Sequence, residues 1–213
     1  MNNNDKILLK NQQKILGWLC ILLPILCIGF GLFGQFAGVN HPNWFHSISA
    51  TYHANSKLFM ISLLCMTAVY FWAYSGYDKI DNILTCISAI CAFGVAAFPT
   101  GGGTNENIIG LFCLNSSISS IFHCIFAGIL YASFIVQILR FRKHGNKMTE
   151  KKKLRNKVYL ICAIIMICAI LCFALVDPLG FPGYGIIISE CFLQFGYGFS
   201  WLIKAGCVKY LND

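Results

Sequence analysis

Side chains that could do chemistry are few in this chain, and four of them stand out: Ser49, His53, His123 and Glu190. Ser49 and His53 are four residues apart, so a helix would place both on one face. His123 and Glu190 lie within apolar runs, where an ionisable group is costly and usually serves a function. The sequence therefore predicts a polar pocket that binds a lipid head group or a small polar ligand. The expected pocket residues are Ser47, Ser49, Tyr52, His53, His123 and Glu190.

The same residue types allow an alternative, a catalytic zinc site. His53, His123 and Glu190 would supply two nitrogen ligands and one oxygen ligand, with water in the fourth position. Zinc-bound water is a nucleophile near neutral pH. The protein would then be a metal-dependent lipid hydrolase within the membrane, with Ser49 or Tyr52 stabilising the oxyanion. Because no His-x-x-x-His or His-Glu-x-x-His pair anchors two ligands on one helix, zinc is not favoured. The sequence leaves open whether the protein is an enzyme.

Each of these residues also has a purely structural interpretation. His53 fits a solvated histidine at a membrane interface, and His123 fits a single hydrogen bond to a neighbouring helix. Ser47 and Ser49 are residue types that cap the first turn of a helix. Asp177 precedes a proline and fits a turn. Glu190 is the hardest to explain structurally, because a carboxylate in an apolar run must be protonated, paired or beside a wet cavity.

The composition indicates which elements must position these groups. Only 11% of the 213 residues are charged and 57% are hydrophobic, with a mean hydropathy of +0.67. A soluble domain has about 25% charged residues. The excess of apolar residues therefore predicts an integral membrane protein. The net charge of +8 is explained by basic residues that flank membrane spans, and nucleic-acid binding is not expected.

Six apolar segments approach the roughly 20 residues that a helix needs to cross the hydrocarbon core. They cover approximately residues 15–35, 58–74, 83–98, 118–139, 158–176 and 184–203. Backbone groups must be satisfied within lipid, and the alternation typical of barrel strands is absent, so helices are expected. The predicted fold is an all-α integral membrane protein, a six-transmembrane-helix bundle that forms one domain over residues 1–213.

Basic residues predict the orientation of the bundle. Nine of the sixteen lie between Arg140 and Lys157, and six more lie at the termini or between the second and third spans. Only Lys57 falls on the other side. Under the positive-inside rule, the loop 140–157 and both termini are cytoplasmic. All the candidate site residues then lie near the outer surface. A composition rich in Asn, Lys and Ile, with short loops, favours a bacterial plasma membrane.

Small residues suggest how the helices pack. Eleven of the twelve cysteines lie within or at the ends of the spans, without a Cys-x-x-Cys pair, so they are expected to pack as small apolar groups. Gly196, Gly198 and Ser200 would allow close helix packing in the last span. Membrane lipids are the expected partners, and these small residues also allow a homo-oligomer. A third functional alternative is therefore an oligomeric channel or membrane effector.

Several motifs carry a resemblance to known families. They are Ser47–His53, Tyr74–Asp78, Ala96–Thr100, His123, Glu190 and Phe199–Lys204. Together they resemble a family of uncharacterised six-span bacterial membrane proteins, over residues 40–205. More distantly, Ser47–Ser49 resembles the DRAM/FRAG-type six-span family of eukaryotes, which implies a six-helix fold and a link to autophagy regulation or lipid-anchor remodelling. That family continues with Asp-Thr-Gly, where this chain has Ala50–Tyr52.

The spacing of Ser49 and His53 is also similar to the Ser-x-x-x-His of alkaline-ceramidase-type membrane hydrolases. Those enzymes use a further His-x-x-x-His on a late span, which this chain lacks. The resemblance therefore does not carry their activity to this chain.

Overall fold

Six α-helices dominate the computed structural model, which describes residues 3–40, 43–103, 105–143, 148–176 and 184–212. The helices are α1 (Asn3–Phe36), α2 (Lys57–Ala73), α3 (Lys79–Ala97), α4 (Ser116–Phe141), α5 (Glu150–Val176) and α6 (Gly185–Lys204). Four 3₁₀ helices are η1 (Trp44–His46), η2 (Ser49–His53), η3 (Gly101–Gly103) and η4 (Lys209–Leu211). A short antiparallel hairpin pairs β1 (Ile108–Ile109) with β2 (Leu114–Asn115).

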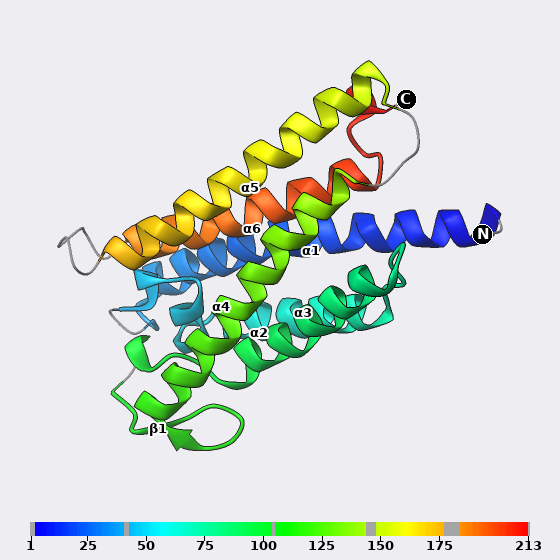
Figure 1. Cartoon of the computed structure of the whole chain (residues 1–213). Helices are drawn as coiled ribbons and strands as arrows, with labels where there is room; N and C mark the ends of the chain where they lie inside the picture. The colour runs from blue at the N-terminus through cyan, green and yellow to red at the C-terminus, as the bar shows by residue number, and fades with distance from the viewer. Residues whose placement is uncertain (1–2, 41–42, 104, 144–147, 177–183, 213) are drawn as a thin grey trace.

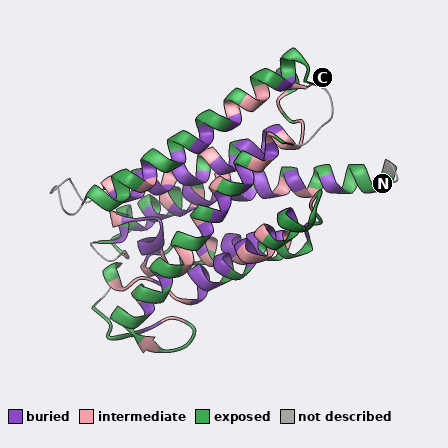
Figure 2. Ribbon diagram, in the orientation of Figure 1, coloured by how far each residue is buried: buried purple, intermediate pink, exposed green. Residues whose placement is uncertain are grey.

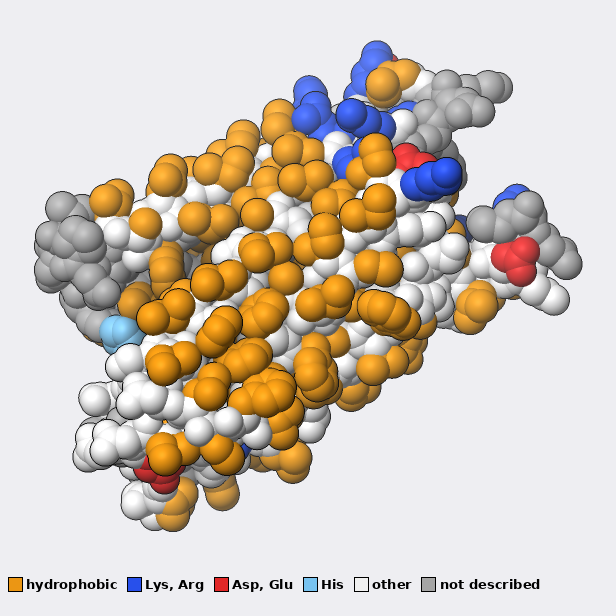
Figure 3. Space-filling view, turned by 60° about the horizontal axis from the view of Figure 1, so that its bottom comes forward, with side chains coloured by type: hydrophobic (Ala, Val, Ile, Leu, Met, Phe, Trp, Pro, Cys, Tyr) orange, Lys and Arg blue, Asp and Glu red, His pale blue; other side chains and the backbone are white. Residues whose placement is uncertain are grey.

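The helices form a ring in which neighbours in sequence are neighbours in space. Each helix packs against the next, and α6 closes the ring by returning to α1. The chain ends lie together at one end of the bundle (Figure 1). We call this the basic end, because α4 ends and α5 begins there, and the opposite end the far end. Figure 3 shows Lys and Arg side chains gathered at the basic end.

Five helices, α1 and α3 to α6, are long and apolar enough to cross a membrane. The sixth, α2, has 17 residues. Figure 3 shows apolar side chains spread over one face of the bundle. Large exposed apolar side chains of the protein include Phe33, Val69, Trp72 and Leu171. Water does not tolerate an apolar surface this extensive on a monomeric protein. An integral membrane protein is therefore indicated, as the composition predicts.

Each predicted span coincides with a helix, but some helices extend well beyond the apolar segment. The α1 helix already begins at Asn3, well before residue 15, and a second difference concerns residues 140–157, which were expected to form a loop. Instead, α4 continues to Phe141 and α5 begins at Glu150, which leaves only residues 142–149 between them. Hydropathy detects the part of a helix that suits lipid, whereas the backbone hydrogen bonds of the helix continue into the polar interface. Asp177, expected in a turn, lies outside the described residues.

Figure 2 shows that the buried residues (purple) lie mostly along the inner faces of the helices, and several of them are aromatic. Phe71 of α2, Phe134 of α4, and Tyr197 and Trp201 of α6 are almost completely buried. The Phe134 and Tyr197 rings stack with centroids 3.5 Å apart. The hydroxyl of Tyr197 donates to Gln137 Oε1 at 2.7 Å. Side chains therefore fill the interior of the helix ring near the middle of the bundle.

Close packing of α6 uses small residues, as predicted, but within the chain. A Cβ atom on Gly198 would lie 2.7 Å from the carbonyl oxygen of Gly17 in α1. A Cβ atom on Gly196 would lie 3.1 Å from Met166 in α5, and Ser200 is fully buried. These residues are consequently occupied by contacts between helices of one chain, so they do not argue for a homo-oligomer.

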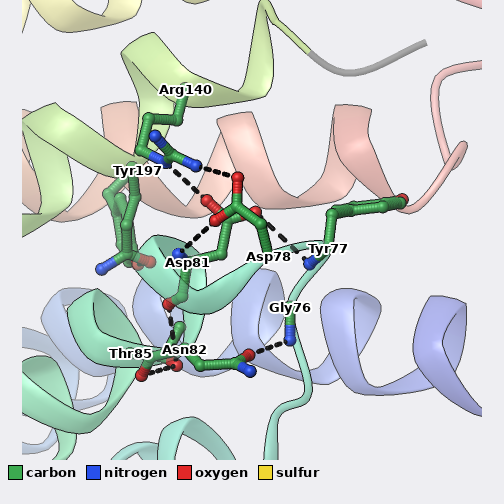
Figure 4. Close-up of polar contacts among 9 residues, drawn as sticks. Gly76, Tyr77, Asp78, Asp81, Asn82, Thr85, Arg140 and Tyr197 are labelled. Atoms are coloured by element: carbon green, nitrogen blue, oxygen red, sulfur yellow. Dashed lines mark hydrogen bonds and ion pairs between the residues drawn. The ribbon is translucent and has the colours of Figure 1, made fainter.

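An ion-pair cluster joins α3 to α4 at the basic end (Figure 4). Arg140 Nε donates to Asp81 at 2.6 Å, and Arg140 Nη2 donates to Asp78 at 2.5 Å. Asp78 also caps α3 by accepting the Asp81 backbone N–H at 2.9 Å. That hydrogen bond and the guanidinium of Arg140 hold the pKa of the Asp78 carboxyl below its ordinary value. The cluster therefore fixes the turn between α2 and α3 against the end of α4.

Candidate functional site

The segment between α1 and α2 is folded into the far end of the bundle. We call residues 44–54, which contain η1 and η2, the cap segment. Trp44, Ile48, Ala50 and Thr51 are buried in it. The Trp44 indole N–H donates to Gln35 Oε1 of α1 at 2.7 Å, which ties the start of the segment to the end of that helix. The cap segment is thus packed against the helices and is not an exposed loop.

Glu190 of α6 contacts the cap segment. It stands five residues after α6 begins at Gly185, about 7–8 Å along the helix. Its Oε2 accepts the backbone N–H of Ile48 at 2.5 Å, and its Oε1 lies 3.3 Å from the Ser49 hydroxyl. Glu190 is only 7% exposed. The carboxyl group that was hardest to explain structurally from the sequence is therefore paired with the start of η2.

Ser49 also contacts His123, which comes from α4. The Ser49 Oγ lies 2.8 Å from His123 Nε2. On the other side of the ring, Nδ1 lies 2.7 Å from the carbonyl oxygen of Phe98, the C-cap residue that follows α3. Because a carbonyl oxygen can only accept a hydrogen bond, Nδ1 must carry a hydrogen. In the neutral ring Nε2 is then unprotonated and accepts the Ser49 hydroxyl hydrogen.

A chain of polar contacts therefore runs from Glu190 through Ser49 and His123 to Phe98. The Ser49 hydroxyl has one hydrogen for two neighbours. If it donates to His123, Glu190 must itself be protonated to donate to Ser49; if it donates to Glu190, His123 must be the doubly protonated ring. Either arrangement contains one shared proton. Ser49 therefore bridges an ionisable group of α6 and an ionisable group of α4.

A cavity of about 370 Å³ lies beside these polar contacts, between α4, α5 and α6 and next to the cap segment. Its volume falls within the usual range of ligand pockets, roughly 300–1,000 Å³. Ser49, His123 and Glu190 form a polar part of its wall, whereas apolar side chains such as Ile170, Phe173 and Leu193 form much of the rest. Such a wall matches a ligand with one polar end and an apolar body.

The cavity is open to the side between α4 and α5. Cys124 and Gly128 of α4 and Phe173 of α5 line it, and all three are exposed on the surface of the bundle. In Figure 1, α4 and α5 lie closest near the basic end and diverge toward the far end. A Cβ atom on Gly128 would meet no atom within 4 Å. The opening thus faces the side of the bundle rather than only its end.

A second, much smaller cavity of about 20 Å³ lies behind Ser49. Glu190, Gln194 and Tyr131 line it together with apolar side chains. The Gln194 amide donates to the Tyr131 hydroxyl at 3.4 Å. The volume of this cavity is close to the minimum of roughly 10–15 Å³ that one water molecule requires. Hydrogen-bonding groups from α4 and α6 therefore surround a space of atomic size next to the Ser49 hydroxyl.

Four of the six predicted pocket residues, Ser47, Ser49, His123 and Glu190, line the larger cavity. Ser47 has a structural role as well, because its Oγ accepts the Ala50 N–H at 2.9 Å.

The other two predicted pocket residues, Tyr52 and His53, lie elsewhere in the cap segment. His53 Nε2 is 2.7 Å from the carbonyl oxygen of Thr100. The Tyr52 ring lies under the ammonium group of Lys57, 4.1 Å from the ring centroid. Neither residue is among those that line the cavity. Their place in the predicted pocket is therefore not reproduced by the fold.

The zinc alternative also depends on His53. Among the residues that the structure describes, there is no group of three His, Cys, Asp or Glu side chains that could hold a metal ion. His53 turns toward Thr100, while His123 and Glu190 are joined through Ser49. The ligand set His53, His123 and Glu190 therefore does not form.

Two site residues, Tyr131 and Gln194, escaped the sequence interpretation. Gln194 follows Glu190 by four residues, and Tyr131 follows His123 by eight. Both spacings keep residues on one face of a helix. Helical periodicity, applied to the two ionisable residues, would have found both.

No protein-family model, curated protein or solved structure matches this chain. The resemblance of its motifs to the six-span bacterial family and the DRAM/FRAG-type family stays a prediction.

Proposed function

We propose that this protein is a six-span plasma-membrane protein whose larger cavity binds a lipid-like amphiphile. The polar head of the ligand would contact Ser49, His123 and Glu190. Its apolar chain would lie along Ile170 and Phe173 and leave between α4 and α5. One observation carries this proposal. The wall of the cavity combines the buried polar contacts of Ser49, His123 and Glu190 with an apolar surface that is open to the side.

The six-span topology rests on the length and charge of the helices. The α2 helix, with 17 residues, is about 25 Å long, against a hydrocarbon core of about 30 Å. Spans somewhat shorter than the core are accommodated by local thinning of the bilayer. The gathering of Lys and Arg at the basic end (Figure 3) supports a cytoplasmic location for that end. The cavity would then open in the outer leaflet, where phospholipid head groups lie near His123 and Glu190.

Photochemical cross-linking tests this binding. The full chain is placed in phospholipid vesicles that contain a phosphatidylethanolamine with a diazirine on its acyl chain. After illumination, mass spectrometry of peptides finds the labelled residues. We expect labelling of the α4 segment around Cys124 and Gly128 and of the α5 segment around Phe173, because these residues form the lateral opening.

A matched pair of glycine variants decides whether the labelling reports the cavity. Gly128→Trp would fill the opening, whereas Gly29→Trp makes the same change in α1, where a Cβ atom also meets nothing within 4 Å. We expect Gly128→Trp to reduce the α5 labelling several-fold and Gly29→Trp to leave it unchanged. Equal labelling in both variants would show that the probe reaches only the outer surface, and the proposal would fall.

A further inference from the structure

We propose that Ser49 is a nucleophile and His123 its general base, so that the cavity hydrolyses an ester-linked acyl lipid. This inference rests on the proposed function, because the substrate would be the amphiphile in that cavity. It differs from the zinc alternative in needing no metal: the hydroxyl of Ser49, rather than a metal-bound water, attacks the carbonyl carbon.

The contact between Ser49 and His123 has the geometry of an activated nucleophile. A nucleophile and its base lie within about 2.6–3.2 Å, and a third group orients the base. Here the Oγ–Nε2 distance is 2.8 Å. The carbonyl of Phe98 receives the Nδ1 hydrogen at 2.7 Å, which directs the lone pair of Nε2 toward Ser49. A backbone carbonyl thus takes the orienting position that a carboxylate holds in many serine hydrolases.

The nucleophile is also held in place and accessible to a ligand. Glu190 holds Ile48, the residue before Ser49, through its backbone N–H. Ser49 and His123 are 8% and 3% exposed, yet both line the larger cavity. A lipid that enters between α4 and α5 would therefore meet Ser49 without passing through bulk water. Exclusion of water strengthens the hydrogen bonds and charge interactions of such a site.

The small cavity behind Ser49 suits the negative charge that develops on the carbonyl oxygen. Ser49, Tyr131 and Gln194 all line it. A phenol and a primary amide are both hydrogen-bond donors, and donors aimed at a developing oxyanion account for a large part of catalysis in acyl transfer. Tyr131 and Gln194 are accordingly the expected oxyanion donors.

The reaction balances with water as the second substrate. Ser49 Oγ bonds to the acyl carbon while its proton passes to His123 Nε2. The carbon–oxygen bond to the head group breaks, and the leaving alkoxide takes that proton from His123, which leaves an acyl-Ser49. Water then attacks the acyl carbon and gives a proton to Nε2. The bond to Ser49 breaks and Oγ recovers that proton, so an ester and water yield a fatty acid and an alcohol.

A long-chain alkyl fluorophosphonate tests the assignment on the full chain in detergent. In this reaction Ser49 Oγ would bond to phosphorus, fluoride would leave, and His123 would take the hydroxyl proton. We expect a phosphonyl adduct on the Ser49 peptide. The adduct should be absent from Ser49→Ala and should form about 100-fold more slowly in His123→Gln, the usual scale of a general base. Ser133→Ala, a buried serine of α4 outside the cavity lining, should react like the wild type.

The lipid cross-linking experiment separates failure of this inference from failure of the proposed function. A wild-type protein that cross-links the phospholipid at α5 but gives no adduct on Ser49 would refute the nucleophile and leave binding intact. Loss of both signals would refute both. His123→Gln that reacts as fast as wild type would refute the base. Retained cross-linking in Ser49→Ala and His123→Gln shows that these variants are folded.

Discussion

Glu190 is the residue on which the geometry of the site depends most directly. Its Oε2 accepts the Ile48 N–H, and its Oε1 neighbours the Ser49 hydroxyl. A buried N–H without an acceptor costs about 1–3 kcal/mol. The same carboxyl group therefore fastens the cap segment to α6 and contributes a proton site to the polar chain.

Two substitutions at Glu190 separate these roles. Glu190→Gln keeps a carbonyl oxygen for the Ile48 N–H but removes the ionisable group, whereas Glu190→Ala removes both. We expect Glu190→Ala to lower the free energy of unfolding by about 1–3 kcal/mol and Glu190→Gln to lower it less. Thermal unfolding in one detergent, followed by circular dichroism, measures both. Identical midpoints for the two variants would mean that the carboxyl group does not anchor the cap segment.

The sequence predicted that the site residues lie near one end of the bundle, but it did not predict all of their contacts. His123 and Glu190 were recognisable as ionisable groups near the same ends of two spans, and both reach Ser49 as the pocket required. His53 was misplaced because a four-residue spacing was interpreted as an α-helix. Ser49 and His53 instead belong to the 3₁₀ helix η2, where three residues complete a turn. Residues four apart then point about 120° away from each other.

At the scale of elements, apolar length was enough to locate all six helices. It was not enough to give their ends, because helical hydrogen bonding in α4 and α5 continues into the basic residues between 140 and 157. The order of the helices around the ring was also beyond the sequence, because apolar composition alone does not say which faces pack together. Gly17 and Gly198 show the missing information: two small residues on different helices become meaningful only as a pair.

The crossing of α1 and α6 at these glycines gives a prediction with a built-in control. A Cβ atom at Gly198 would lie 2.7 Å from the Gly17 carbonyl oxygen, so Gly198→Ala forces the helices apart. Gly29→Ala adds the same methyl group to α1 in open space. Alanine also loses less backbone freedom than glycine when the helix forms, which favours the folded state by about 0.5–1 kcal/mol.

We expect Gly198→Ala to lower the unfolding temperature in detergent and Gly29→Ala to keep or raise it. If Gly198→Ala is as stable as wild type, the backbones of α1 and α6 are not in direct contact.

At the scale of the whole molecule, charge and chemistry lie at opposite ends. Lys and Arg gather at the basic end (Figure 3), together with the cluster of Arg140, Asp78 and Asp81. The cap segment and the cavity occupy the far end. In a membrane this polarity determines which leaflet can deliver a ligand to Ser49. Orientation is therefore part of the proposed function, and a lipid of the outer leaflet is the expected ligand only if the basic end faces the cytoplasm.

Two natural cysteines report that orientation without altering the site. Cys113 lies between β1 and β2 at the far end, and Cys207 follows α6 at the basic end; both are exposed. In intact bacterial spheroplasts that express the protein, a membrane-impermeant maleimide should label Cys113. It should label Cys207 only after the membrane is permeabilised, because the basic end is expected inside. Cys113→Ser and Cys207→Ser assign each signal, since each should remove one labelled peptide and leave the other.

Labelling of Cys207 before permeabilisation, with Cys113 protected, would invert the topology. The cavity would then draw its ligand from the inner leaflet, and the orientation given by the basic residues would be wrong for this chain.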